Sequence, residues 1–131
     1  MRALPRLIGL ATAIALLGAA DAPSRVQASS LDRQVIRRVI RKQVRAIYTC
    51  WAREAARGTP LGRGRAVVEL EIATSGRVTR AAFTVDPVRS DPVTRCIVAV
   101  FLSMRFPTYT ETGPVLVRYP LWFDPDGSND E

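Results

Sequence analysis

The chain has 131 residues, of which 47% are apolar and 24% charged, and this composition favours one folded domain over disorder along the whole chain. Its formal net charge is +7, and it contains no histidine. The lack of histidine removes the commonest general base and transition-metal ligand, and the two cysteines cannot form a four-cysteine zinc site. We therefore expect a binding or structural module without a cofactor rather than an enzyme.

Residues 1–28 have the pattern of a cleaved export signal. A basic start precedes an uncharged apolar run over residues 7–20, which matches the core of a signal peptide. Small residues suitable for cleavage end at Ala20 and at Ala28, and we favour cleavage after Ala28. An uncleaved N-terminal anchor is the alternative, although the run is short for a membrane span. We expect the mature protein in the periplasm or outer envelope of a Gram-negative bacterium.

Export determines how the two cysteines are interpreted. In an oxidising compartment, Cys50 and Cys96 are expected to form a disulfide. The chain-entropy model assigns about 4 kcal/mol to a crosslink that closes a loop of about 47 residues. A thiol redox pair is the alternative, but the chain lacks the Cys-x-x-Cys spacing typical of such sites.

The first element of the folded part is predicted to be a single long amphipathic helix. Ser30 is a candidate N-cap, with Asp32 in the first turn. From Ile36 to Ala55, apolar residues recur every three or four positions, which is the period of a helix with one buried face. Gly58 favours the end of the helix at that point. The opposite face is basic and carries Arg37, Arg38, Arg41, Lys42 and Arg45.

The next segment changes to the two-residue period of β-strands. Residues 65–73 and 78–85 predict a β-hairpin, with Gly76 supplying a positive φ in the turn. In the second strand, the alternating apolar positions are Ala81, Phe83 and Val85. The acidic residues of the first strand are expected to form ion pairs across the hairpin rather than to act as an acid–base pair. They are Glu69 and Glu71, with Arg77 or Arg80 as partners.

A second helix and a third strand complete the predicted domain. Asp91 is the expected N-cap of the helix, with Pro92 at its first position, and residues 105–107 end it. The third strand covers residues 115–123. Its proline, Pro120, has no N–H to give to a ladder, so we expect this strand at a sheet edge.

The order of these elements predicts a two-layer α+β domain, in which two helices pack on a three-stranded antiparallel sheet (α-β-β-α-β). We assign residues 29–123 to this domain and residues 124–131 to a disordered acidic tail. The tail contains Asp124-x-Asp126-Gly127, which is part of a calcium-loop pattern, but the further acidic ligands of such a loop are missing. No metal site is therefore expected.

Several short motifs follow one another in the order found in a known family. They are Tyr48-x-Cys50-Trp51, Ser75-Gly76-Arg77-Val78, Cys96-Ile97, Met104-Arg105-Phe106-Pro107 and Val117-x-Tyr119-Pro120-x-x-Phe123. From about Leu31 to Phe123, the chain resembles the C-terminal domain of TonB-type energy transducers. The variant at the C-terminus of the gliding-motility AgmX/PglI proteins is the form it resembles most.

The resemblance implies that a partner peptide is captured by strand addition. In TonB-like domains, the last strand offers its edge to a short peptide of an outer-membrane partner, whose main chain pairs with the exposed N–H and C=O groups. The implied peptide-binding edge consists of Val115, Leu116, Val117, Arg118 and Tyr119. A protected edge strand that binds nothing is the alternative.

The basic helix face is the second candidate site. Its five cations are suited to an anionic envelope lipid or polymer, or to an acidic partner, whereas a purely solvated face is the alternative. Nucleic acid is not expected as a partner, because the protein is expected to be exported and aromatic residues do not interleave with these arginines. We therefore expect a non-enzymatic adaptor that contacts an envelope protein or peptide, with an anionic surface as the alternative partner.

Overall fold

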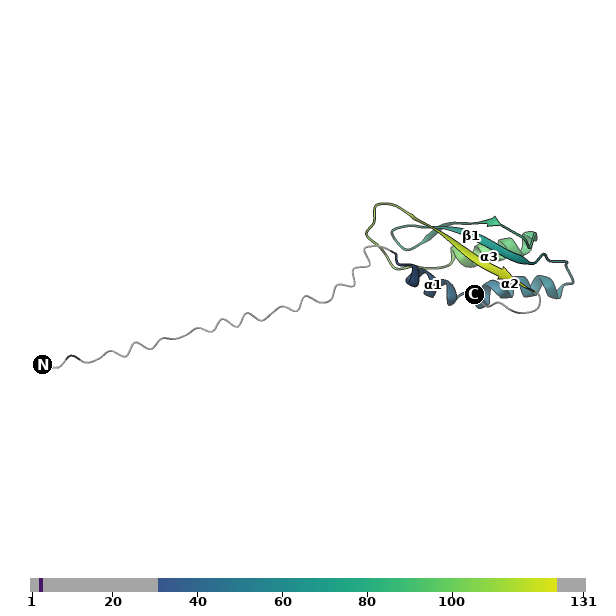
Figure 1. The fold of residues 1–131 in the computed structure, drawn as a ribbon, viewed down its shortest axis with the longest axis horizontal. Helices are drawn as coiled ribbons and strands as arrows, with labels where there is room; N and C mark the ends of the chain where they lie inside the picture. The colour runs from purple at the N-terminus through teal and green to yellow at the C-terminus, as the bar shows by residue number, and fades with distance from the viewer. Residues whose placement is uncertain (1–2, 4–30, 125–131) are drawn as a thin grey trace.

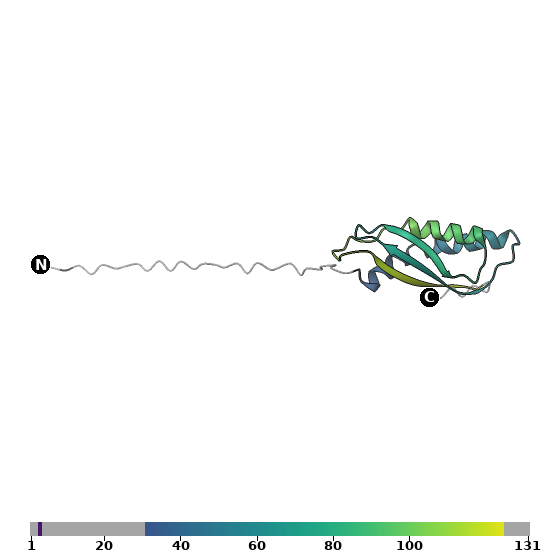
Figure 2. The same cartoon turned by 90° about the horizontal axis from the view of Figure 1, so that it is seen from above.

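The computed structural model describes residues 31–124, together with residue 3 (Figure 1). The two longer helices lie on one face of an antiparallel sheet with the strand order β2-β1-β3, and the short first helix lies beside the last strand (Figures 1 and 2). The predicted α+β class is therefore confirmed, and so is the position of the last strand at a sheet edge. The elements in chain order are α1 (Arg33–Arg41), α2 (Val44–Ala56), β1 (Gly64–Ile72), β2 (Val78–Val85), α3 (Asp91–Leu102) and β3 (Val115–Phe123). The predicted leader (apart from residue 3) and tail residues 125–131 lie outside the described residues.

The prediction of one long N-terminal helix was wrong, because the segment forms two helices. The chain turns at Lys42 and Gln43, where the N–H of Gln43 donates to the carbonyl of Ile40 at 2.9 Å. This bond spans three residues instead of the four of an α-helix, so the helix tightens and stops. Apolar periodicity continues across the turn, since both helices bury their apolar positions in one core, and it therefore gives no sign of the break. Asp32, rather than Ser30, caps α1 by accepting from the N–H of Gln34 at 2.9 Å.

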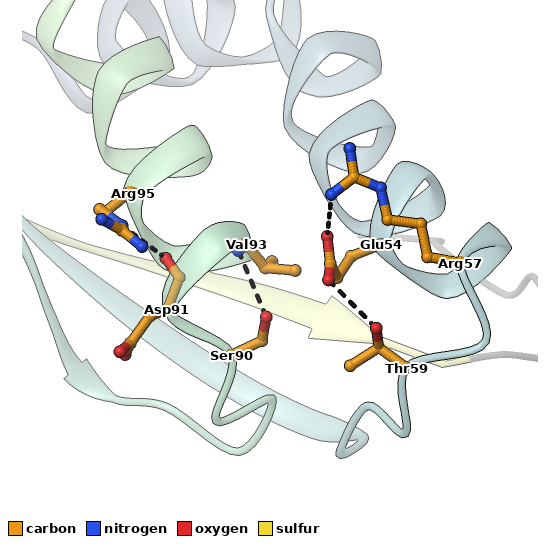
Figure 3. A network of polar contacts seen from close by, with 7 residues as sticks. All are labelled: Glu54, Arg57, Thr59, Ser90, Asp91, Val93 and Arg95. Atoms are coloured by element: carbon orange, nitrogen blue, oxygen red, sulfur yellow. Dashed lines mark hydrogen bonds and ion pairs between the residues drawn. The ribbon is translucent and has the colours of Figure 1, made fainter.

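Serine rather than aspartate caps α3. The hydroxyl of Ser90 accepts from the N–H of Val93 at 3.4 Å (Figure 3), and Asp91 is the first helical residue instead of the predicted N-cap. Pro92 then occupies the first turn, where its missing N–H costs no helical hydrogen bond. The Nε of Arg95 donates to the carbonyl of Asp91 at 3.4 Å. The helix and its cap therefore each begin one residue earlier than predicted.

A small polar cluster marks the end of α2. Glu54 pairs with Arg57 at 3.5 Å and accepts from the hydroxyl of Thr59 at 3.1 Å (Figure 3). Gly58 has a φ of 79°, the left-handed conformation that often ends a helix, as the sequence predicted. The chain then turns back towards β1.

The central strand β1 supplies the inner layer of the core. Its residues Ala66, Val68, Leu70 and Ile72 are all fully buried towards the helices, as the two-residue period predicted. The helices cover this layer with side chains such as Ile40 of α1, which is fully buried. The opposite face of β1 carries Val67 and the two glutamates.

Two bulges shape the pairing of β1 with β2. Register shifts near the two ends of β2 leave Thr84 and Thr79 as extra residues in that strand. Each threonine hydroxyl donates to a carbonyl of β1, Thr84 to that of Val67 at 3.4 Å and Thr79 to that of Glu71 at 3.3 Å. The side chains of the inserted residues thus bond to the partner strand at the places where the regular ladder is interrupted.

The bulge at Thr84 changes the face on which Val85 lies. Ala81 and Phe83 pack against the core, whereas Val85 is the register partner of Val67 and is 48% exposed. The prediction that Val85 continues the alternation of the strand was therefore wrong. One inserted residue moves every later side chain to the other face, and a two-residue sequence period cannot reveal it.

The predicted disulfide is present and joins α2 to α3. Cys50 and Cys96 are bonded across a Cα–Cα distance of 5.7 Å. Cys50 is 5% exposed, so its half of the bond lies within the core. Because the two helices also pack side by side, the crosslink fixes the helical layer against which the sheet folds.

The segment between α3 and β3 crosses the hairpin turn and sets the start of β3. The N–H of Phe106 donates to the carbonyl of Gly76 at 2.8 Å. The buried hydroxyl of Tyr109 donates to the carbonyl of Ile72 at 2.6 Å and accepts from the N–H of Val115 at 3.0 Å. Since Ile72 and Val115 are register partners, this hydroxyl closes the last rung of the β1–β3 ladder.

Candidate functional site: the groove between α1 and β3

A groove of about 680 Å³ lies between α1 and the edge strand β3. All five residues of the predicted peptide-binding edge line it, together with Pro120 and Trp122. The wall on the other side comes from α1 and the residue before its cap, and it consists of Leu31, Arg33, Ile36, Arg37 and Arg41. The fold therefore brings the predicted edge strand and part of the predicted basic face to one site.

The backbone of β3 alternates between groups that face β1 and groups that face outward. In an antiparallel ladder, the N–H and C=O of one residue point to the same side, and this side alternates along the strand. Pro120 is the register partner of Val67 and has no N–H to offer, which suits a position whose groups point away from β1. By this alternation, Leu116, Arg118 and Trp122 also direct their backbone groups outward.

Two hydrogen bonds agree with this alternation. Tyr48 of α2 donates its hydroxyl to the carbonyl of Trp122 at 2.9 Å, from outside the β1–β3 ladder. Val115 is at an odd-numbered position, so its backbone groups face β1. Its N–H donates to the hydroxyl of Tyr109, which in turn donates to the β1 carbonyl of Ile72. The outward groups of Leu116 and Arg118 therefore form the part of the edge that faces the groove.

Side chains along β3 divide between the two faces of the sheet. Val115, Val117 and Tyr119 are half-buried and pack against the core. Leu116 and Trp122 lie on the opposite face of the strand, the face of Arg118, and they are 65% and 47% exposed. A strand added at this edge would therefore have one row of side chains on the helix side and one row beside these two apolar residues.

The glutamates of β1 do not make the predicted contacts with Arg77 or Arg80. Glu69 bonds to Arg118 of β3, with 3.2 Å between a carboxylate oxygen and Nε. Glu71 accepts from the hydroxyl of Thr79 at 3.2 Å. For Glu69 the prediction was wrong because β1 is the central strand, so its side chains meet those of β3 as well as those of β2. Glu71 has Arg80 as its register partner across the hairpin, but its carboxylate bonds to Thr79 instead.

The predicted basic face is divided by the break between the helices. Arg37 and Arg41 line the groove, whereas Arg38, Lys42 and Arg45 are exposed but do not line it. The structure adds Arg33 to the groove, a residue that the sequence analysis left out of the face. Its spacing of four residues from Arg37 was the signal that could have identified it.

The short motifs singled out in the sequence have structural roles in this fold. The ring of Tyr48 lies against that of Phe123, with the centroids 5.7 Å apart. Gly76 bonds to Phe106, so the motif at the hairpin turn meets the motif after α3. Trp51 buries its indole Nε1 without a hydrogen-bond partner. The contacts among these motif residues account for their roles in packing and supply no reactive group.

Comparisons of the chain with models of protein families, with curated proteins and with solved structures found no match. The resemblance to TonB-like domains therefore rests on the order of the motifs. Over residues 31–124, no helix has both the length and the apolar character needed to cross a membrane. Over the same residues, histidine, cysteine, aspartate and glutamate form no group of three that could hold a metal ion. Of the calcium-like pattern, only its first residue, Asp124, falls within the described part of the chain.

Proposed function

We propose that this protein is an exported, non-enzymatic adaptor of the cell envelope that binds an extended peptide by strand addition to β3. The observation that carries this proposal is the outward-facing backbone of Leu116 and Arg118 beside the groove at the sheet edge. A partner strand would satisfy these N–H and C=O groups and extend the sheet to a fourth strand. The ordered motifs shared with TonB-like domains support the same mode of binding.

The dimensions and the disulfide support this proposal. The groove volume of about 680 Å³ falls within the range of about 300–1,000 Å³ that is usual for ligand sites. The disulfide between Cys50 and Cys96 is typical of proteins in an oxidising compartment, in keeping with the signal-like start of the chain.

A proline at an outward-facing position of β3 tests strand addition. Leu116→Pro removes one N–H from the edge and places a ring where a partner strand would pair. Leu116→Ala is the matched control, because it shortens the same exposed side chain and keeps the N–H. We expect peptides selected from a random library on the oxidised full chain to bind Leu116→Pro at least about tenfold more weakly, and Leu116→Ala less than about threefold more weakly.

Amide hydrogen exchange gives a second measurement of the same binding mode. A bound strand should slow the exchange of the Leu116 and Arg118 amides, because these groups point into the groove. Selected peptides that bind both variants equally and leave these amides unprotected would contradict strand addition. Binding to anionic lipid vesicles that persists in Leu116→Pro and falls steeply with salt would instead support the basic-face alternative.

A further inference from the structure

The charge around the groove specifies the partner more closely than the edge strand alone. We propose that the segment bound at β3 carries carboxylates at alternate positions, on the side that faces α1. This inference rests on the proposed strand addition, since only an extended peptide has the required spacing. The partner would thus be an acidic, extended segment of another protein.

The basic wall of the groove has the repeat of an extended chain. Arg33, Arg37 and Arg41 follow one another at intervals of four residues, and all three line the groove. Four residues of an α-helix rise about 6 Å. Alternate residues of a β-strand are about 6.6–6.8 Å apart. Successive carboxylates on one face of a bound strand would therefore meet successive arginines of α1.

The charge in the groove is not balanced by acids of its own lining. Four arginines line the groove and no carboxylate does so among the described residues. Arg118 already bonds to Glu69, whereas Arg33 and Arg37 are exposed on the wall. Carboxylates are the groups that match arginine in charge and geometry.

The other face of the added strand meets the apolar residues of the groove lining. Its side chains would lie beside Leu116 and Trp122, the exposed apolar residues of β3. The matching partner is a segment in which acidic and apolar residues alternate, with the acids on the helix side. A flat anionic surface has no such alternation, and it would contact Arg38 and Arg45 as readily as Arg33 and Arg37.

Three peptides of seven residues test the inference with the oxidised full chain. The first is acetyl-Thr-Glu-Val-Glu-Val-Glu-Thr-amide, the second has glutamine in place of each glutamate, and the third has the same composition as the first with its three glutamates adjacent. We expect the first peptide to bind about tenfold more tightly than the second, and at least about threefold more tightly than the third. The third peptide controls for net charge, because it differs from the first only in the order of its residues.

Matched arginine variants locate the effect. Arg33→Gln/Arg37→Gln should lower the affinity for the first peptide about three- to tenfold and leave the glutamine peptide almost unaffected. Arg38→Gln/Arg45→Gln removes the same charge from outside the groove and should change either affinity less than about twofold. Equal losses in the two double variants would mean general electrostatic attraction and would overturn the inference.

The outcomes separate this inference from strand addition itself. If the glutamate and glutamine peptides bind equally, both to the full chain and to its tail variant Asp126→Asn/Asp130→Asn/Glu131→Gln, and both protect the Leu116 and Arg118 amides, the acidic specificity is wrong and strand addition stands. If neither the test peptides nor the library-selected peptides protect these amides, strand addition fails and the inference fails with it.

The acidic tail, residues 124–131, follows β3 directly and is the other possible occupant of the groove. The same titrations are therefore repeated with Asp126→Asn/Asp130→Asn/Glu131→Gln. A preference for glutamate that emerges only in this variant supports the role of the arginines, because the chain's own acids then compete for them. No preference in either protein overturns the inference.

Discussion

Removal of the disulfide is the perturbation whose effect the structure defines best. Cys50→Ala/Cys96→Ala deletes a crosslink between residues that are 46 positions apart in the sequence. In the chain-entropy model, a loop of this length constrains the unfolded chain by about 4 kcal/mol. The contacts between α2 and α3 remain, so the loss comes mainly from a less restricted unfolded state. Because the free energy of unfolding of a small domain is only about 5–15 kcal/mol, the variant should retain the fold with a much lower free energy of unfolding.

Urea unfolding followed by far-ultraviolet circular dichroism measures this effect. The variant should unfold with a free energy about 3–4 kcal/mol lower than that of the oxidised protein. Its m-value should be larger, because an unfolded chain without the crosslink exposes more surface. As a control, a reductant should destabilise the natural protein by a similar amount and leave the variant unchanged. A loss below about 1 kcal/mol with an unchanged m-value would refute the reasoning.

Four further substitutions test other parts of the fold by the same unfolding measurement. Gly76→Ala should cost at least about 2 kcal/mol, because a Cβ would meet a backbone carbonyl oxygen at 1.8 Å at a φ of 85°. Gly58→Ala, at a φ of 79° in open space, should cost only about 1 kcal/mol, and equal losses would contradict the close contact. Tyr109→Phe should cost about 1–3 kcal/mol by leaving three backbone groups, those of Ile72, Gly113 and Val115, without their hydroxyl partner. Val117→Pro should destabilise the protein by at least about 1 kcal/mol more than Leu116→Pro, since the N–H of Val117 points towards β1. The reverse order would refute the alternation of backbone groups along β3.

The sequence was sufficient for the three strands, for α3 and for the disulfide. The two-residue period of β1 and the glycine at the hairpin turn are local signals, and they fix these elements directly. The proline of β3 also indicated an edge strand. Because backbone groups alternate in direction along a strand, the position of this proline also specified which neighbours direct their backbone outward. The prediction nevertheless treated residues 115–119 as equivalent.

The features that the sequence did not predict depend on contacts between distant segments. The break at Lys42 and Gln43 occurs without glycine or proline, and the apolar pattern continues across it. The bulges at Thr79 and Thr84 depend on how β2 pairs with β1, which no single-strand pattern records. The groove arises only once α1 lies beside β3, so Arg33 had no reason to be grouped with residues of the last strand.

Because of the break between α1 and α2, the two sides of the groove are held in place with unequal strength. The covalent link holds α2 to α3, whereas α1 is attached through its own apolar contacts, beyond the turn. We expect α1 to open at a lower free energy than the rest of the helical layer, and its amides to exchange hydrogen sooner. A hinged wall opposite a fixed strand would let the proposed site admit peptide side chains of different bulk without loosening the backbone register of the added strand.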